Sequence, residues 1–424
     1  MSEQTAPDIA TTAQPAASAL RFVLIGQDSP SCTADLVAVV AKLDEDVIDL
    51  AQGAVHGWLT LSVTTTLRCG QDRLQSAVEA VADRHSLQVH VESPSDDGLS
   101  QPHRAGRVSV VVIGAPLHAT ALGAITSAIT AHGARMDRVR RLVSMPVTGL
   151  EIDVSGADVT VLGPMLAKLA ATHSVDVAVA PGGLERRGRR LLVMDVDSTL
   201  IQDEVIELLA RHAGVEAQVH EITERAMAGE LDFAQSLHER VATLAGLPES
   251  VLDDVRRAVR LTPGAATLVR TVRRLGFTVA VVSGGFIEIV GPLAAELGIH
   301  HAHANALEIR DGRLTGRVSG AVVDRAEKAR ALRRFADQEG LPLSRTVAVG
   351  DGANDLDMLA IAGLGIAFNA KPLVRAEAHA SVSVPYLDAV LYLLGISREE
   401  VEDADLLDAP DSLDHADSLD SRHG

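Results

Sequence analysis

Two stretches within the first 180 residues repeat one order of hydrophobic and polar positions. When the chain is shifted by 88 positions, Gly26 aligns with Gly114, and each glycine follows an apolar run typical of a strand. In both stretches a helical stripe, alternating segments, a second helical stripe and a short apolar run come next. The pattern predicts two tandem β-α-β-β-α-β modules of the ferredoxin-like fold, the first module at residues 19–98 and the second module at residues 106–182.

The segments beside these modules have a different composition. SPSDDGLSQPHRAG at 93–106 is rich in Ser, Pro, Asp and Gly and indicates a linker. Residues 1–18 lack a basic segment and a continuous apolar core, so we expect a disordered leader rather than a signal peptide. Because the ferredoxin-like fold serves many functions, the modules by themselves do not indicate one.

The pattern changes after residue 182. A basic, Gly-rich stretch at 181–190 precedes the apolar run LLVMDV at 191–196. Further strand-like runs, separated by helical patterns, lie at 277–283, 346–350 and 364–368. Strands that alternate with helices predict an α/β domain with a doubly wound parallel sheet, which we place at residues 183–395. A helical stretch at about 200–262, here called the insertion, interrupts the strand pattern.

The composition agrees with layered α/β packing. Apolar residues make up 47% of the 424 residues and aromatic residues only 2%, so the cores must be built from Ala, Val, Leu and Ile. The two cysteines, Cys32 and Cys69, are too few for a disulfide framework and are not at metal-ligand spacing. We therefore expect no sulfur chemistry.

The charge excludes one large class of partners. The net charge is −19, and residues 399–424 hold ten acidic residues against Arg422 alone. Such a composition predicts an acidic disordered tail at 396–424, and the acidic body offers no surface for nucleic acid. No apolar run is long enough to span a membrane, so we expect a cytoplasmic protein without a membrane partner.

Polar side chains follow three of the predicted strands. Asp195 and Asp197 follow LLVM, Ser283 begins a Ser-Gly-Gly sequence, and Asp351 lies in GDGAND. In a doubly wound sheet, ligands bind at the carboxyl ends of the strands. Each feature alone also fits an ordinary turn or helix cap, and Lys328, on a predicted helix, alone fits a solvated surface residue. Their occurrence together, in the order that one site requires, favours a common function.

At these positions the chain resembles the haloacid dehalogenase superfamily of phosphatases and, within it, the phosphoserine phosphatase family. The resemblance covers about residues 190–395 and depends on DVDST, VVSGGF and VGDGANDLDM. It implies that Asp195 attacks phosphorus and that Asp197 acts as general acid and base. It also implies Mg²⁺ held by Asp195, Asp351 and the backbone carbonyl of Asp197, with phosphate bound by Ser283 and Lys328. Gly284 and Asn354 are further substrate-binding residues by the same resemblance.

These implied roles are physically coherent. A phosphate dianion must approach a carboxylate, and Mg²⁺ together with the Lys328 ammonium would offset the repulsion. Asp197, beside other carboxylates, can hold a proton that an isolated aspartate would lose at neutral pH. Formation and then hydrolysis of an aspartyl-phosphate would replace one difficult displacement at phosphorus with two easier ones.

The insertion resembles the small helical cap of the same family, which closes over a small molecule. The resemblance implies that Glu204, nine residues after Asp195, binds the substrate ammonium and that Arg240 binds its carboxylate. Met227 matches an apolar residue of the cap. The implied reaction is hydrolysis of O-phospho-L-serine to L-serine and phosphate, the last step of serine biosynthesis.

The two modules resemble ACT domains, regulatory units that bind amino acids at interfaces. Asp28 and Ser31 lie in a turn similar to the D-x-P-G turn of that family, with serine in the place of glycine. The resemblance implies an effector site there, for which serine is a candidate. Paired modules leave sheet edges and one sheet face exposed, so we expect a homodimer or a larger even oligomer.

Other functions stay open from the sequence. A related phosphatase or phosphotransferase could act on another phospho-metabolite or on phosphoproteins, and an amino-acid-sensing protein could retain an inactive phosphatase part. The run of His300, His301 and His303 also suggests a metal site, but no further ligand is visible nearby.

Overall fold

The computed structural model describes residues 18–94, 106–183, 188–227 and 230–408. Most of the predicted leader and of the linker therefore lies outside the described residues. The chain divides into two compact units, residues 1–103 and residues 104–424. Each unit is described by itself.

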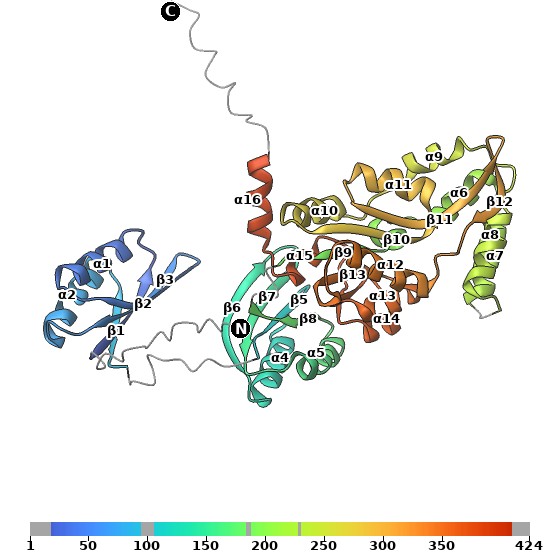
Figure 1. The fold of residues 1–424 in the computed structure, drawn as a ribbon. Helices are drawn as coiled ribbons and strands as arrows, with labels where there is room; N and C mark the ends of the chain where they lie inside the picture. The colour runs from blue at the N-terminus through green and yellow to red at the C-terminus, as the bar shows by residue number, and fades with distance from the viewer. Residues whose placement is uncertain (1–17, 95–105, 184–187, 228–229, 409–424) are drawn as a thin grey trace, which may run out of the picture. The chain divides into compact units, whose positions relative to one another are not determined.

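The first unit contains the first module. Its elements are β1 (Ala19–Gln27), α1 (Cys32–Lys42), β2 (Val47–Val55), β3 (Trp58–Thr66), α2 (Gln71–Arg84) and β4 (Gln88–Glu92). The strands form an antiparallel sheet in the order β2-β3-β1-β4, which confirms the predicted β-α-β-β-α-β order. Both helices cover one face of this sheet (Figure 1).

Burial in β1 alternates as expected for a sheet with one covered face. Leu20, Phe22 and Leu24 are buried, whereas Arg21 and Val23 between them are only partly buried. On the face away from the helices, Trp58 and Val55 oppose one another and are 60% and 65% exposed. Within its own unit, the first module thus leaves apolar side chains exposed.

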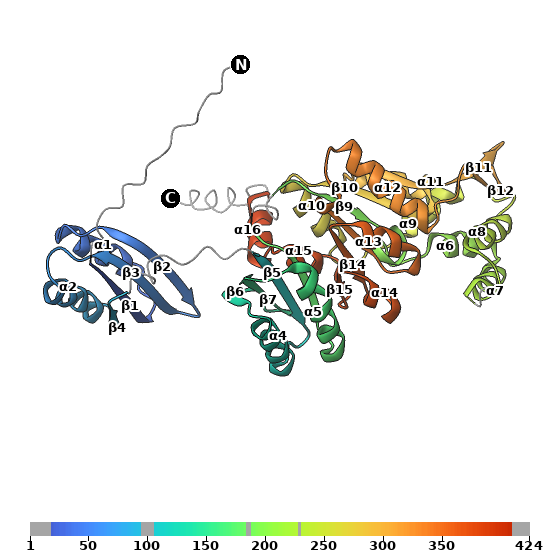
Figure 2. The same ribbon diagram turned by 60° about the horizontal axis from the view of Figure 1, so that its bottom comes forward.

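The second module has the same order of elements. They are β5 (Val108–Gly114), α4 (Ala119–Ala131), β6 (Arg135–Val143), β7 (Thr148–Ser155), α5 (Val159–His173) and β8 (Asp176–Pro181), with sheet order β6-β7-β5-β8. In contrast to β1, every residue of β5 is buried. Helices α4 and α5 cover one face of this sheet (Figure 2). Val110 and Val112 belong to the core that these helices cover, whereas Val111 and Ile113 pack into the core of the domain that follows.

Polar contacts join the second module to the C-terminal part of its unit. The Asp176 carboxylate accepts hydrogen bonds from the hydroxyls of Ser381 and Ser383, at 2.7 and 2.9 Å. Arg140 donates to the Gly395 carbonyl at 2.6 Å. Because these contacts accompany a shared apolar core, the second module and the α/β domain form one packed body.

The α/β domain is built on a sheet with the order β12-β11-β10-β9-β13-β14-β15. Its strands are β9 (Leu191–Met194), β10 (Thr278–Phe286), β11 (His301–Arg310), β12 (Arg313–Ser319), β13 (Thr346–Gly350), β14 (Leu364–Phe368) and β15 (Ala380–Val382). Each neighbouring pair in the run β11-β10-β9-β13-β14-β15 is parallel, whereas β12 pairs with β11 antiparallel. The predicted doubly wound parallel sheet is confirmed, with the β11–β12 hairpin and β15 as additions that the sequence pattern had not indicated.

Helices pack on both faces of this sheet, which is why β9, β13 and β14 are buried at every residue. The helices are α10 (Ala265–Arg274), α11 (Ile287–Glu296), α12 (Arg325–Gln338), α13 (Leu356–Ile361), α14 (Pro372–Glu377) and α15 (Ala389–Leu393). Leu192 and Met194 point into one apolar cluster, Leu191 and Val193 into the other.

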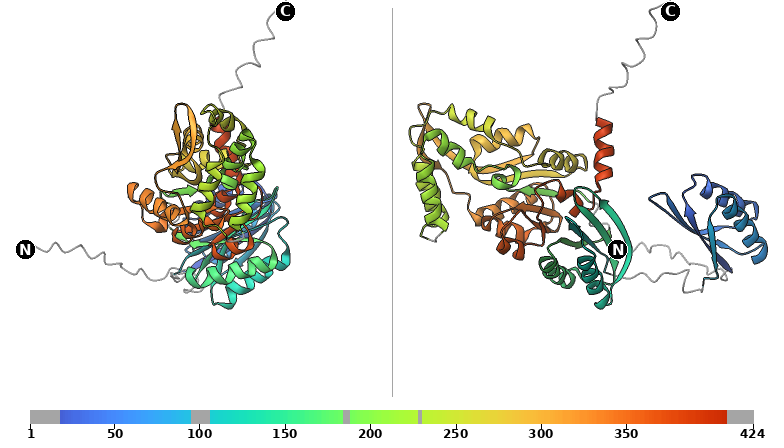
Figure 3. Two further views of the ribbon diagram at one scale, coloured as in Figure 1. Left: turned by 90° about the vertical axis from the view of Figure 1, so that its right-hand side faces the viewer. Right: turned by 180° about the vertical axis from the view of Figure 1, so that it is seen from behind.

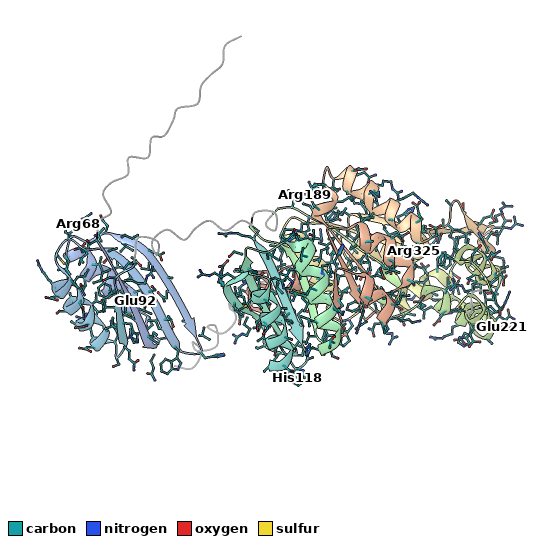
Figure 4. The ribbon with its side chains drawn as sticks, turned by 90° about the horizontal axis from the view of Figure 1, so that it is seen from below. Arg68, Glu92, His118, Arg189, Glu221 and Arg325 are labelled. Carbon is teal, nitrogen blue, oxygen red and sulfur yellow. The ribbon has the colours of Figure 1, made fainter. Side chains whose placement is uncertain are left out.

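The insertion follows β9. It contains α6 (Val205–Ala213), α7 (Glu216–Met227), α8 (Phe233–Ala242) and α9 (Val251–Ala258). Ile201 and Leu261 form an isolated antiparallel bridge, so the insertion leaves and re-enters the domain at one place. Figure 3 (right) shows α7 and α8 at the end of the unit away from the second module, and Figure 4 shows the same separation between Glu221 of α7 and His118 before α4.

The prediction of a disordered tail from residue 396 is wrong for its first part. Residues Arg398–Asp408 form α16, whose Val401 is buried. The Asp405 carboxylate accepts hydrogen bonds from both Arg270 and Arg274 of α10. The acidic composition is thus partly neutralised by arginines distant in sequence, which a composition argument cannot detect. Residues 409–424 lie outside the described residues.

A membrane-spanning segment was not expected from the sequence. In the part of the chain that the structure describes, no helix combines the length and the apolar character needed to cross a bilayer.

Candidate active site

The candidate site lies where three parallel strands end. Asp195 follows β9, Ser283 lies near the end of β10, and Asp351 follows β13. β9 is paired with β10 on one side and β13 on the other, so these strand ends are neighbours. The Asp195 backbone N–H donates to the Val349 carbonyl at 2.9 Å and extends the contact between β9 and β13. The structure thus brings together the predicted strand-end residues.

A buried ion cluster occupies this edge of the sheet. The Lys328 ammonium, delivered by α12, lies 2.8 Å from Asp195 Oδ1 and 2.7 Å from Asp355 Oδ1, and all three side chains are almost fully buried. Burial by itself lowers the pKa of Lys328, but the carboxylates of Asp195 and Asp355 outweigh it and raise that pKa. A buried cation between two carboxylates is therefore charged at neutral pH.

The same environment acts on the carboxyl group of Asp195. Its pKa lies well above the ordinary aspartate value, first because of burial and then because of the negative charge of Asp355, with Lys328 opposing both. Asp195 Oδ1 also accepts a hydrogen bond from the Val196 N–H at 2.7 Å. One carboxylate oxygen is thus held by two donors.

Asp355 is the site residue that the sequence analysis did not assign. Its carboxylate accepts hydrogen bonds from Lys328 and, at 3.1 Å, from the Gly352 N–H. A Cβ at Gly350 would lie 2.4 Å from the Asp355 Cγ, so glycine is required there for this side chain to turn under β13. The signal was present in the sequence, because Asp355 is the last residue of GDGAND.

Three carboxylates could hold a metal ion. Within the described residues, Asp195, Asp351 and Asp355 form the one group of potential ligands whose oxygens lie within 4.8 Å of one another. Burial, followed by the charge of Asp355, raises the pKa of Asp351 to about 6, and the Thr199 hydroxyl donates to it at 3.3 Å. Carboxylate oxygens are the ligands that Mg²⁺ prefers in proteins, so this group fits that ion.

The Asp197 side chain points elsewhere than to this carboxylate group. Its Oδ2 accepts from the Ser283 hydroxyl at 2.9 Å and its Oδ1 from the Val205 N–H at 2.8 Å. The pKa of Asp197 is raised, mainly by removal from water, while these two donors oppose the rise. A Cβ at Gly285 would lie 2.9 Å from Asp197 Oδ2, so the glycine leaves room for the aspartate.

The insertion forms a second part of the site, with Glu204 and Arg240. Glu204 precedes α6 and is half-buried, and the Ser198 hydroxyl donates to its Oε1 at 2.8 Å. Burial, followed by the charge of Asp197, raises the pKa of Glu204 to about 7. Burial lowers the pKa of Arg240 on α8, whereas the charges of Glu204 and Asp197 raise it, so these three residues share one environment.

Other predicted residues lie as follows. Asn354 is half-buried beside Gly352, where a Cβ would be 2.1 Å from the Asn354 Oδ1. A Cβ at Gly284 would lie 3.3 Å from the Phe233 ring, so α8 of the insertion approaches the Ser-Gly-Gly segment. The side chain of Met227 lies outside the described residues.

Two histidines of the run pair with glutamates. His301 pairs with Glu339 at 2.8 Å and His303 with Glu327 at 3.1 Å, and both glutamates belong to or adjoin α12. No metal-ligand group of the described residues includes these histidines. They connect β11 to α12 instead.

The two predicted effector residues belong to the first unit. The Asp28 N–H donates to the Gly57 carbonyl at 2.8 Å, and Ser31 is exposed immediately before α1.

Comparisons with known proteins agree with this architecture. Residues 192–360 match the family model of haloacid dehalogenase-like hydrolases, and residues 23–92 and 107–180 each match an ACT domain model. A phosphoserine phosphatase of Streptomyces coelicolor is 55% identical over 386 residues, which are 91% of this chain and 94% of that protein. The chain belongs to the phosphoserine phosphatase family.

Family members differ in how much of this chain they match. A phosphoserine phosphatase of Streptococcus thermophilus is 53% identical over 204 residues, 48% of this chain but 95% of its own length. A solved structure described as a probable phosphoserine phosphatase from Vibrio cholerae is 35% identical, covers 70% of this chain and 88% of its own, and has a TM-score of 0.54. The family resemblance stated from DVDST, VVSGGF and VGDGANDLDM is confirmed, as are the two ACT domains.

Proposed function

We propose that this chain is a Mg²⁺-dependent phosphoric monoester hydrolase that converts O-phospho-L-serine to L-serine and phosphate, the last step of serine biosynthesis. The observation that carries the proposal is the buried Asp195–Lys328–Asp355 cluster at the carboxyl end of β9. The names of the Streptomyces and Streptococcus relatives support the substrate.

Asp195 is the nucleophile of this proposal. Lys328 and the Val196 N–H both contact Oδ1, so Oδ2 is the oxygen assigned to attack phosphorus. The bond from phosphorus to the serine oxygen breaks as the aspartyl-phosphate bond forms. Asp195, Asp351 and the backbone carbonyl of Asp197, with Asp355 beside them, would hold Mg²⁺, whose charge would reduce the repulsion between phosphate and carboxylate.

Asp197 moves the protons. Its raised pKa allows it to hold the proton that the departing serine oxygen needs. In the second half of the reaction the resulting carboxylate takes a proton from the water that attacks the aspartyl-phosphate, so Asp197 returns to its starting state. Ser283, Gly284, Lys328 and Asn354 bind the phosphate oxygens, since hydroxyl, amide and ammonium donors suit an anion.

Recognition of the amino-acid head belongs to the insertion. The Glu204 carboxylate binds the substrate ammonium, and the Arg240 guanidinium binds its carboxylate in two parallel hydrogen bonds. Their shared environment supports this role, because the two ends of one small zwitterion must be reached together.

The test is phosphate release by the purified full chain. We expect Mg²⁺-dependent release from phosphoserine, loss of activity with EDTA and recovery when Mg²⁺ is restored. Phosphothreonine, sugar phosphates and phosphopeptides are compared as alternative substrates. Homoserine is added as an acceptor to detect transfer of phosphate to an alcohol. Preference for any of these over phosphoserine contradicts the proposed substrate, and absence of all turnover would favour an amino-acid-sensing protein.

The same proposal includes regulation by serine and assembly into a homodimer through the modules. The exposed Trp58 and Val55 on the first module support assembly, because another subunit would remove them from water. Serine alters activity only if it prefers one arrangement of subunits, with a coupling of about 1–3 kcal/mol.

This part is tested by deleting residues 1–103, which form a separate unit, and not residues 1–180. The longer deletion would uncover the apolar face that the second module buries. We expect the shorter deletion to lower the number of subunits per particle, as measured from the mass in solution, and to weaken serine inhibition. An unchanged number of subunits and unchanged inhibition would show that the first module neither assembles nor regulates the enzyme.

A further inference from the structure

The pairing of β10 with β11 is interrupted beside the site. Ser283 lies opposite Ala304, but the next pair is Phe286 with Asn305, so Gly284 and Gly285 have no partners in β11. An interruption of this kind bends the strand and changes the direction of its side chains. Here it turns the Gly285 N–H back to the Ser283 hydroxyl, at 2.8 Å.

The Asn305 side chain fills the gap in the ladder. It is 1% exposed, its Nδ2 donates to the Gly284 carbonyl at 2.8 Å, and its Oδ1 accepts from the Val323 N–H at 2.8 Å. Both ends of the amide are thus used by backbone groups, which would otherwise be buried without partners at a substantial free-energy cost.

The second of these groups leads directly to Lys328. Val323 precedes Asp324, the N-cap of α12, whose carboxylate accepts from the Glu327 N–H at 2.7 Å. The Asp324 carbonyl accepts from the Lys328 N–H at 2.9 Å. The position of Val323 therefore determines where the first turn of α12 begins and where the backbone of Lys328 lies.

Asn305 thus connects the two segments that supply phosphate ligands. The Ser283–Gly285 segment belongs to β10, and Lys328 belongs to α12, which begins 39 residues after the end of β10 at Phe286. The two segments are close at this point, since the Val323 carbonyl lies 4.0 Å from the place of a Cβ on Gly284.

We propose that Asn305 is a positioning residue that sets the spacing of Ser283 and Lys328 around the transferred phosphoryl group. The proposal rests on the phosphatase function proposed above. Asn305 does not touch substrate; it acts through the Gly284 carbonyl and the Val323 N–H. Small displacements of groups that surround a reacting centre reduce rates strongly, by up to about 100-fold for 1 Å.

Two substitutions separate the ends of the amide. Asn305→Asp keeps an acceptor for the Val323 N–H but replaces the donor to the Gly284 carbonyl with an oxygen. Asn305→Leu removes both contacts at similar volume. We expect the rate constant for phosphorylation of Asp195 to fall about 10-fold for the first and up to about 100-fold for the second.

The readout is single-turnover acid-quench measurement of the aspartyl-phosphate in the full chain at saturating Mg²⁺. Phosphoserine and p-nitrophenyl phosphate, which lacks the amino-acid head, are compared. Because the phosphate is common to both substrates, we expect the same fold-change for both. We expect the amplitude, which counts competent sites, to stay at the wild-type value.

The matched control is Thr346→Val. Thr346 is also 1% exposed and also joins two backbone groups, the Leu343 carbonyl at 2.8 Å and the Gly363 N–H at 3.2 Å. It lies at the start of β13, at the other end of the sheet from the site. We expect this variant to lower the melting temperature without changing the phosphorylation rate constant.

The outcomes are distinct. A reduced amplitude with an unchanged rate constant, or failure of both Asn305 variants to fold, shows a purely structural role and rejects the proposal. A loss confined to phosphoserine also rejects it, because the effect would then concern the head of the substrate. If the wild-type protein hydrolyses p-nitrophenyl phosphate but not phosphoserine, the proposed substrate fails while the Asn305 test can still be made.

Discussion

The reaction end of the site, around Asp195 and Lys328, and the recognition end, around Glu204 and Arg240, are constructed differently. Asp195, Lys328 and Asp355 are buried between strand ends and α12, and each contacts at least one other member of the cluster. Glu204, immediately before α6, and Arg240, on α8, are half-buried residues of the insertion, and the Glu204 carboxylate is held by the Ser198 hydroxyl.

Because of this difference, we expect the reaction end to determine the rate of the reaction and the recognition end to determine the choice of substrate. A buried, fully paired cluster keeps its geometry before substrate arrives, which electrostatic stabilisation of a transition state requires. Recognition groups on a half-exposed insertion can close on a substrate and then release the product. Changes at the reaction end should therefore affect every phosphate ester, and changes at the recognition end only amino-acid substrates.

The largest effect is expected for Asp195→Asn. The amide is a poor nucleophile and removes a negative charge beside Lys328, so we expect kcat to fall by at least about 10,000-fold for phosphoserine and for p-nitrophenyl phosphate alike. Phosphate release measures the loss, and acid quench should detect no phosphorylated protein. Retention of activity on either ester would falsify the nucleophile assignment.

Arg240→Ala should give a large effect on one substrate only. Hydrogen bonds to charged groups contribute about 1.5–3 kcal/mol, so we expect kcat/KM for phosphoserine to fall roughly 10- to 150-fold. The value for p-nitrophenyl phosphate should stay unchanged. Arg240→Lys keeps the charge without the planar fork and should recover only part of the loss. An equal fall in kcat/KM for both esters would show that Arg240 does not belong to a separate recognition end.

A pH profile tests Glu204. Its pKa of about 7 means that the carboxyl is protonated below neutral pH and cannot attract the substrate ammonium there. We expect kcat/KM for phosphoserine to rise as the pH increases through about 7 and then to level off. Glu204→Gln should have lower activity above pH 7 and should lack this rise. An identical profile in the variant would assign the titration to another group.

The smallest effect is expected for Ser198. This residue has a φ of 55°, in the left-handed region that favours glycine, and donates to Glu204. Ser198→Gly removes the hydroxyl but suits the backbone, so we expect KM for phosphoserine to rise roughly 2- to 12-fold at an unchanged melting temperature. Ser198→Ala should raise KM equally and also lower the melting temperature. If KM is the same in all three proteins, Ser198 does not position Glu204.

Much of the reaction end could be predicted from the sequence. Asp195, Ser283 and Asp351 directly follow or end apolar strands, and parallel strands bring their carboxyl ends to one edge, so local pattern and strand order suffice. Asp355 was within the quoted motif, but only the turn at Gly350 shows that its carboxylate points back to Lys328.

The remaining features depend on contacts between distant segments. His301 and His303 suggested a metal in the sequence, yet they pair with glutamates of or beside α12, and their neighbour Asn305 connects β10 to α12. The tail was expected to be disordered from its composition, but Arg270 and Arg274 pair with Asp405.

The two ACT domains show this limit most clearly. By itself the sequence determined that both have the β-α-β-β-α-β order, because alternation and helical periodicity are local properties of the chain. Only the tertiary structure decided that β5 is buried on both faces and β1 on one. Whether the second face of a sheet is covered depends on the apolar surface that another part of the chain presents, here the α/β domain that packs against Val111 and Ile113.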